Sequence, residues 1–193
     1  MSDLDILDSA GKTPPTDEAD LYKSGIYLFM DAVTADSCKD AIEFVLKQNT
    51  EKKKQKRLQF MICSPGGMMP ECFALIDIMK GSRIPIHTVG LGCIASCGLL
   101  LFITGEKGYR VLTPNTSILS HQFSWGNWGK EHELFAQVKE FELSTKRMLD
   151  HYKKCTGLDE EEIREHLLPP EDRWLSAKEA KKLGICDNVK SVY

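Results

Sequence analysis

The sequence predicts an α/β fold built on parallel strands. Short apolar runs that are typical of strands alternate along the chain with segments of helical periodicity. Two of the strand-to-helix junctions carry glycine-rich turns, at 64–67 and at 92–98. The chain has 193 residues, of which 42% are hydrophobic. A chain of this length and composition can bury one core without disulfides or bound metals.

The first part of the chain contains two strand–helix pairs. Apolar runs at 26–30 and 58–63 predict the strands. Thr34 is placed to cap the helix after the first strand, because a threonine side chain can accept a hydrogen bond from the first turn. In the helix after the second strand, Pro70 lies near the first turn and Gly81 lies just past the end, as is typical of helix boundaries.

The longest apolar stretch, 84–104, has the length of a membrane span. Pro85 and three glycines interrupt it, and this punctuation favours a buried strand, a turn and a buried helix instead. We therefore expect no membrane segment.

The last part of the chain predicts two short strands and three helices. The acidic run at 159–162 opens one helix. Ser176 and Glu179 form a capping box at the start of another helix, and Gly184 closes it. The longest helix carries apolar residues at helical spacing on one face: Leu134, Val138, Phe141, Met148 and Tyr152.

The composition excludes several classes of protein. The formal net charge is −3, so there is no basic excess to neutralise the phosphates of a nucleic acid. The seven cysteines are scattered and form no Cys-x-x-Cys pair, so we expect reduced thiols in a cytosolic compartment and no metal site. The acidic first 20 residues lack the features of a secretory signal or a transit peptide.

Ser96 is the candidate nucleophile. It lies at a junction between an expected strand and an expected helix, among small residues, which is the general form of a nucleophile elbow. The local string is Ala-Ser-Cys-Gly and not Gly-x-Ser-x-Gly, so a buried helix cap remains the alternative interpretation.

A nucleophilic serine needs a base, and five histidines are available. His132, His151 and His166 lie in charged helical stretches and are expected at the surface. His87 and His121 lie in apolar, strand-like runs, where a hydrogen-bonded core histidine is the alternative. The residues alone therefore indicate an α/β domain that could be a Ser–His hydrolase.

Five short blocks occur along the sequence in this order: Ser64-Pro-Gly-Gly67, Gly92-x-x-Ala-Ser96-x-Gly98, Leu112-x-Pro-Asn115, His121-Gln122, and Asp172-Arg173-x-Leu-Ser-Ala177-x-Glu-Ala180-x-x-x-Gly184. Taken together and in order, they resemble the ClpP family of self-compartmentalised serine peptidases. The resemblance runs from about Gly25 to the C-terminus. It implies a flexible N-terminal arm or axial region over 1–24 and a single peptidase domain over 25–193.

The resemblance also implies the roles of the site residues. Ser96 is the nucleophile, His121 is the general base and Asp172 is the carboxylate that orients the base. The backbone N–H groups of Gly67 and Cys97 form the oxyanion hole. No cofactor and no metal are implied.

A substrate-binding strand is implied at Gly126, Asn127 and Trp128, where the substrate backbone would bind by β-augmentation. Trp125 and Trp128 are larger than the usual residues there, so we expect a narrowed or reshaped cleft.

The family fold is a crotonase-type spiral of ββα units with a protruding handle helix, which would span about 126–155 here. Family members form homo-oligomers of heptameric rings stacked in pairs. An AAA+ Clp ATPase of the ClpX, ClpA or ClpC type feeds unfolded polypeptides into the chamber, and short peptides are cleaved without it. The expected activity is that of a serine endopeptidase in the cytoplasm of a bacterium or phage-infected host, with the plastid stroma as an alternative.

Three departures mark the chain as a divergent member. The axial-loop sequence is not recognisable in residues 1–24, Gln59 and Gly81 occupy places where aromatic residues form the ATPase-docking pocket, and Pro170-Glu171 replaces a charged pair used between rings. One alternative is therefore a noncatalytic ring subunit or assembly factor, although the intact triad argues against it. The other is a crotonase-type acyl-CoA enzyme, but those chains are usually longer and lack this Ser–His spacing.

Overall fold

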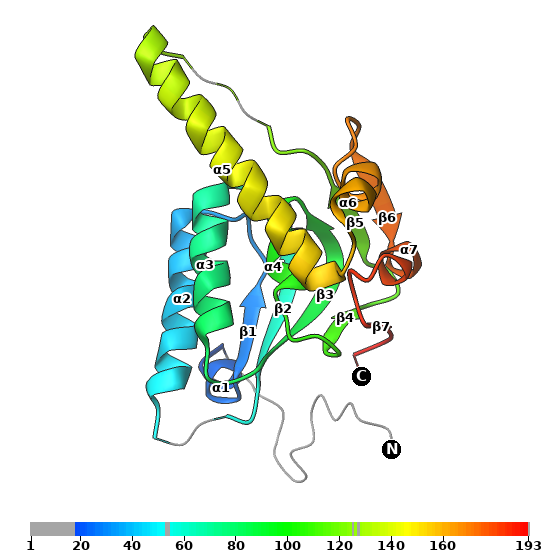
Figure 1. Ribbon diagram of the computed structural model, residues 1–193. Coiled ribbons are helices and arrows are strands. Elements are labelled where there is room, and N and C mark those ends of the chain that lie inside the picture. Colours follow the sequence, from blue (N-terminus) through cyan, green and yellow to red (C-terminus); the bar gives the residue numbers. More distant parts are fainter. Residues whose placement is uncertain (1–17, 53–54, 125, 127, 193) are drawn as a thin grey trace.

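The computed structural model describes residues 18–52, 55–124, 126 and 128–192, and it has the expected α/β architecture. A seven-stranded, mostly parallel sheet forms its centre (Figure 1). Its strands are β1 (Ile26–Phe29), β2 (Leu58–Ser64), β3 (Ile86–Ala95), β4 (Arg110–Leu112), β5 (Ser117–Ser120), β6 (Arg173–Ser176) and β7 (Asn188–Val189). The helices are α1 (Glu18–Lys23), α2 (Ala35–Thr50), α3 (Met69–Gly81), α4 (Cys97–Ile103), α5 (Glu131–Thr156), α6 (Glu160–His166) and α7 (Ala177–Lys182).

The sheet branches at β3. The main path runs β1-β2-β3-β4-β7, and all of its neighbouring strands are parallel. The C-terminal end of β3 leaves β4 and pairs with β5 instead, and β5 pairs antiparallel with β6. The long strand β3 therefore belongs to both parts of the sheet, and the turn that follows it lies where they meet.

Helices α2 and α3 lie side by side along one face of the sheet (Figure 1). Alternate residues of β1 and β2, such as Phe29 and Ile62, are buried under them. Leu28 points to the other face and is 45% exposed, as the two-residue period of a strand requires. The sheet is therefore covered by helices on one face, and β1 presents an exposed apolar side chain on the other.

Several predicted helix boundaries are confirmed. The Thr34 side chain accepts a hydrogen bond from the Ser37 N–H at the start of α2. Asp159 caps α6, and Ser176 forms the predicted capping box with Glu179 at the start of α7. The apolar stretch 84–104 divides into β3 and α4. Within the described ranges, no helix is long and apolar enough to cross a membrane.

The N-terminal arm expected over 1–24 is helical where the structure describes it. Residues 18–23 form α1, and residues 1–17 lie outside the described residues. The Tyr22 ring stacks on Tyr27 with centroids 5.6 Å apart, and it meets Phe44 at 5.2 Å. Aromatic burial therefore attaches this short helix to β1 and α2.

The long helix α5 buries its apolar face over only part of its length. Met148, Leu149 and Tyr152, in the C-terminal half, are at most 7% exposed. Leu134 and Val138, in the N-terminal half, are 36% and 43% exposed, because this half projects beyond the body of the molecule (Figure 1). The apolar residues thus follow the expected helical spacing, but those in the C-terminal half of α5 are buried and those in the N-terminal half are exposed.

A buried ion pair connects the C-terminal region to the sheet and to α5. The Arg110 side chain is 2% exposed and donates to both carboxylate oxygens of Asp187, at 3.0 Å from Nε and 2.7 Å from Nη2. Its Nη1 donates to the Cys155 carbonyl at 2.7 Å, near the end of α5. Burial alone would raise the pKa of Asp187, but hydrogen bonds from Arg110 and from the Gly108 N–H outweigh it, and the pKa is lowered.

His151 is buried, and the expectation that it lies at the surface is wrong. It is 3% exposed, and its Nε2 lies 3.0 Å from the Leu100 carbonyl oxygen. Its Nδ1 lies 2.8 Å from Lys80 Nζ, which can only donate. These partners fit a neutral ring with its proton on Nε2, and burial lowers the pKa of His151 to about 4. The histidine thus links α3, α4 and α5.

We expect Asp187→Ala to destabilise the fold by about 3–5 kcal/mol, because it leaves a buried guanidinium without its partner. Chemical denaturation measures the loss. Lys139→Ala, which breaks an exposed pair with Glu142, is the control and should change stability little. A loss at Asp187 no larger than that at Lys139 would contradict the assignment.

We expect stability to fall as the pH drops from about 6.5 towards 4, because the unfolded chain binds a proton on His151 that the folded chain does not. The contribution reaches roughly 3 kcal/mol. In urea titrations across this range, His151→Asn should reduce the pH dependence and leave the part that buried His87 contributes, and His132→Asn, at an exposed position, should preserve all of it. An unchanged slope in His151→Asn would contradict this origin.

Candidate active site

The strand register brings the three expected catalytic residues to one edge of the sheet. Ala95 in β3 pairs with Leu119 in β5, and Ser120 in β5 pairs with Arg173 in β6. Ser96 directly follows β3, His121 directly follows β5, and Asp172 directly precedes β6. Because β5 and β6 are antiparallel, His121 and Asp172 are the next residues along their ladder.

Ser96 has a strained backbone. Its φ is 53° and its ψ is −123°, and among the described residues it is the one non-glycine residue with a positive φ. Its N–H donates to the Leu119 carbonyl at 2.9 Å, which fixes the turn against β5. A strained serine between a strand and a helix N-terminus is the geometry of a nucleophile elbow, since it presents the hydroxyl at the end of the sheet.

The glycine turn after β2 packs directly against this elbow. A Cβ added to Gly66 would lie 2.6 Å from the Ser96 Cβ and 2.7 Å from the Ala95 oxygen. The φ of Gly66 is +88°, which also favours glycine. The two glycine-rich motifs of the sequence, at 64–67 and 92–98, therefore pack against each other.

The two expected oxyanion-hole residues lie beside each other. Gly67 forms a parallel bridge with Val33: the Val33 N–H donates to the Gly66 carbonyl, and the Met68 N–H donates to the Val33 carbonyl. The N–H and C=O of Gly67 itself therefore face away from Val33. Its carbonyl meets the Cys97 Sγ at 3.2 Å. Cys97 is the first residue of α4, so its N–H has no partner within that helix.

His121 and Asp172 approach each other without a close hydrogen bond. The His121 Nδ1 lies 3.6 Å from the Asp172 Oδ1, which is beyond hydrogen-bond length. The His121 side chain is 24% exposed and that of Asp172 is 66% exposed. Over the described residues, no hydrogen bond joins Ser96 to His121. The three side chains thus have the right neighbours in a loosened arrangement, as is common in sites without a bound substrate.

Buried hydrogen bonds hold the segment that carries His121. The Ser120 hydroxyl donates to the Leu167 carbonyl and lies 3.2 Å from the Tyr152 hydroxyl. The Gln122 side chain donates to the Leu168 carbonyl at 3.1 Å. Burial raises the pKa of Tyr152, so its hydroxyl stays neutral. These contacts connect β5, α5 and the chain before Asp172, and no local sequence signal predicts them.

A group of buried thiols lies behind the elbow. The Cys72 thiol, on α3, donates to the Cys97 carbonyl at 3.4 Å. Burial raises the pKa of Cys72 well above its ordinary value. Hydrogen bonding to Cys72 lowers the pKa of Cys97. No local pattern in the sequence indicates this contact between the thiols and the elbow.

The described residues of the expected substrate-binding segment, Gly126 and Trp128, do not lie in a strand. Within the described part of 121–130, the chain adopts no strand, and Gly126 and Trp128 are exposed. Trp128 is 96% exposed. Asn127 and Trp125 lie outside the described residues. A strand at this position would need a partner to complete its hydrogen bonds, because a single strand leaves its backbone groups unpaired.

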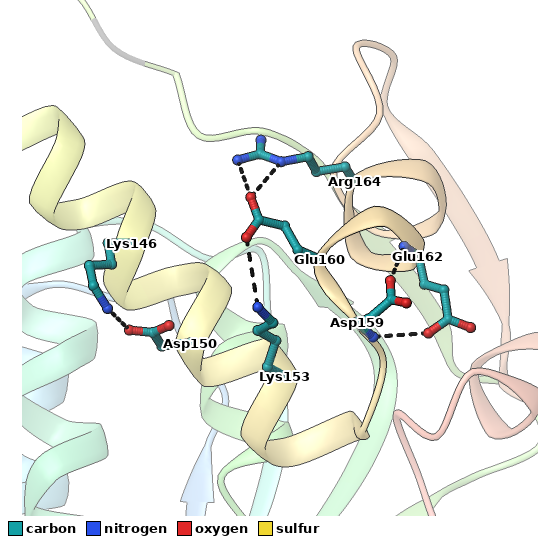
Figure 2. Close-up of polar contacts among 7 residues, drawn as sticks. All are labelled: Lys146, Asp150, Lys153, Asp159, Glu160, Glu162 and Arg164. Atoms are coloured by element: carbon teal, nitrogen blue, oxygen red, sulfur yellow. Dashed lines mark hydrogen bonds and ion pairs between the residues drawn. The ribbon is translucent and has the colours of Figure 1, made fainter.

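A pocket of about 410 Å³ lies between α5 and α6, lined by Phe141, Glu142, Thr145, Lys146, Leu149, Asp150 and Glu160. Figure 2 shows Glu160 of α6 between Arg164 of the same helix and Lys153 of α5, so that the ion pair with Lys153 joins α6 to α5. The Phe141 ring meets Phe123, two residues after His121, with centroids 5.0 Å apart. The pocket is therefore connected to the segment that carries the expected base.

His87 does not belong to this arrangement. Its ring stacks on Tyr109 at 4.1 Å, and burial lowers its pKa to about 4. It lies near the start of β3, and Ser96 follows the other end of that strand. His132 is exposed, and His166 is partly exposed beside Glu165. Of the five histidines, His121 is the one that the strand register places beside Ser96.

Comparison with known protein families gives a match over almost the whole chain. The model of the family described as Clp protease matches residues 14–192. The matched range includes both glycine turns, the elbow and the segment that contains Asp172.

We expect Gly66→Ala to disturb the elbow. Its Cβ would overlap Ser96 and Ala95, so the loss of stability should exceed the effect of a positive φ alone, which costs about 1–2 kcal/mol. Gly108→Ala is the matched control, because Gly108 has a φ of +97° and no neighbour within 4 Å of an added Cβ. Chemical denaturation compares the two variants, and equal losses would contradict the role of the Gly66–Ser96 contact.

Proposed function

Because the chain belongs to the Clp protease family, we propose that it is a serine endopeptidase and the proteolytic core of a self-compartmentalised Clp-type protease. It degrades unfolded polypeptides that an AAA+ unfoldase supplies, and it cleaves short peptides alone. The observation that carries this proposal is the strand register, which supports a site of Ser96, His121 and Asp172 beside two backbone N–H groups.

The proposed reaction is acyl transfer to Ser96. The Ser96 hydroxyl attacks the scissile carbonyl while His121 takes its proton and then gives it to the leaving amine. Asp172 stabilises the imidazolium that forms. The N–H groups of Gly67 and Cys97 bind the oxyanion, and water then releases the acyl group by the same steps in reverse order.

The loosened His121–Asp172 distance suggests that assembly completes the site. Clp proteases generally form oligomeric rings with Clp ATPases, and we propose heptameric rings stacked in pairs here. The projecting half of α5 exposes Phe135 and Val138, which supports a second protomer as its partner. Contact along α5 would act on His121 through Tyr152 and Ser120, since these residues join the helix to β5.

The segment at Gly126, Asn127 and Trp128 remains our proposed site for the substrate backbone. An extended substrate would supply the strand partner that this segment needs. The pocket between α5 and α6 is the candidate for a substrate side chain, because Phe141 and Leu149 give it an apolar lining. The seven free cysteines support a reducing compartment such as the cytoplasm.

A noncatalytic ring subunit is the second candidate. The 66% exposure of Asp172 and its 3.6 Å distance from His121 are what a chain that has lost catalysis would also show. The two candidates differ in one property, which is whether Ser96 is activated.

Treatment with a fluorophosphonate, followed by intact-mass analysis and peptide mapping, tests this property. We expect one adduct on Ser96, none in Ser96→Ala, and a greatly slowed reaction in His121→Ala. Peptide turnover should fall by about 10⁴- to 10⁶-fold in these two variants and by about 10⁴-fold in Asp172→Asn, through the wrong histidine tautomer. His132→Ala, on the exposed face of α5, is the control.

Native mass spectrometry on the same samples reports the assembly. An assembled ring that forms no adduct would overturn the peptidase proposal in favour of the noncatalytic subunit. Activity retained in Ser96→Ala would overturn the assignment of the nucleophile.

A further inference from the structure

We propose that the Cys97 side chain is a positioning residue for the oxyanion hole. Its thiol holds the Gly67 peptide and thereby sets the separation of the two N–H donors. This inference rests on the proposed function, because it assigns work to a site whose activity that proposal supplies. It concerns the side chain of Cys97, whereas the proposed oxyanion hole uses the backbone.

The first step is the geometry of Gly67. Its N–H and its C=O lie on the same side of an extended segment, away from Val33. The Cys97 thiol donates to that C=O at 3.2 Å. The Val33 bridge holds the two peptide planes that meet at Gly67, one through the Gly66 carbonyl and one through the Met68 N–H, and the thiol restrains the second plane from the opposite side.

The second step is that a contact on this side narrows the freedom that Gly67 keeps. An added Cβ would lie 2.2 Å from the Val33 oxygen, so no larger residue fits there. Glycine has the widest range of backbone conformations, so contacts on both of its sides define its φ and ψ more narrowly than the Val33 bridge alone. On the side of Gly67 that faces Ser96, the hydrogen bond comes from the Cys97 thiol.

The third step is a second thiol that fixes the first. Cys72 is fully buried on α3, and it donates to the carbonyl of Cys97 at 3.4 Å. Its raised pKa keeps it protonated and therefore a donor. Two S–H···O bonds thus run in series from α3 to the start of α4 and from there to the Gly67 turn.

If the Cys97 side chain only filled space, its ability to donate a hydrogen bond would not matter. Gly67 is exposed, so in Cys97→Ala a water molecule can replace the thiol as the donor to its carbonyl, but a mobile water does not fix that carbonyl in place. Serine at the same position keeps a donor of nearly the same reach. The pair of substitutions therefore separates the hydrogen bond from the filled volume.

The test is steady-state cleavage of a short fluorogenic peptide by Cys97→Ala and Cys97→Ser in the assembled full-length protein. We expect kcat to fall about tenfold or more in Cys97→Ala with KM nearly unchanged, because the donors act on the transition state and misplacement of one donor forfeits part of its effect. We expect Cys97→Ser to remain within about threefold of the natural chain. Cys186→Ala, which removes a buried thiol outside the site, is the matched control and should keep full activity.

The outcomes separate this inference from the proposed function. Full kcat in Cys97→Ala, or an equal loss in Cys97→Ser, would overturn the positioning role while Ser96→Ala still abolishes turnover. Activity in Ser96→Ala would overturn the proposed function itself. If Cys97→Ala fails to fold in a thermal melt, Cys72→Ala and Cys72→Ser test the same series of bonds, with kcat reduced in the first and restored in the second; equal kcat in these two would overturn the role.

Discussion

The left-handed backbone of Ser96 is the constraint on which the rest of the site depends. A serine with a φ of 53° is costly, and it persists only where its surroundings leave no alternative. The Ser96 N–H is fixed to β5, the next residue starts α4, and Gly66 fills the space beside its Cβ. Each of these neighbours also contributes a residue to the candidate site: β5 carries His121, α4 presents the Cys97 N–H, and the Gly66 turn presents Gly67.

The C-terminal third of the chain supplies the rest of the site, which begins with Ser96 at the end of β3. The strand β6 brings Asp172 to His121, and hydrogen bonds from Ser120 and Gln122 hold the segment that precedes it. Further along, the pair of Arg110 and Asp187 joins this region to β4 and to the end of α5. The site is thus assembled from residues far apart in sequence, and buried polar contacts hold the segments that carry them together.

Local chemistry accounts for the parts of the fold that the sequence predicts. Thr34, Asp159 and Ser176 cap helices because their side chains reach the first turn, which depends on nothing distant. The division of 84–104 into a strand and a helix follows from its glycines. The position of Ser96 at that junction could likewise be read from the sequence, whereas the roles of His121 and Asp172 needed the resemblance.

The remaining features depend on partners that periodicity does not contain. His151 lies in a charged stretch but is buried, because Lys80 and the Leu100 carbonyl satisfy both ring nitrogens. Val138 lies on the same apolar stripe as Tyr152 and is exposed, because the body of the protomer ends before it. In the sequence, nothing distinguishes Cys97 from a small apolar residue. Its hydrogen bond to the Gly67 carbonyl is visible only in the structure.

The pairing of β5 with β6 has a consequence for the dynamics of the protein. The strand β6 has four residues, and the sheet pairs it with β5 alone. Short edge segments with few buried contacts open at a lower free energy than the core, without global unfolding. Detachment of this one strand would carry Asp172 away while Ser96 and the buried sheet stay intact. Under the proposed mechanism, the fraction of time for which Asp172 lies beside His121 would therefore depend on this local opening equilibrium, and a ligand or subunit bound beside β6 would shift it.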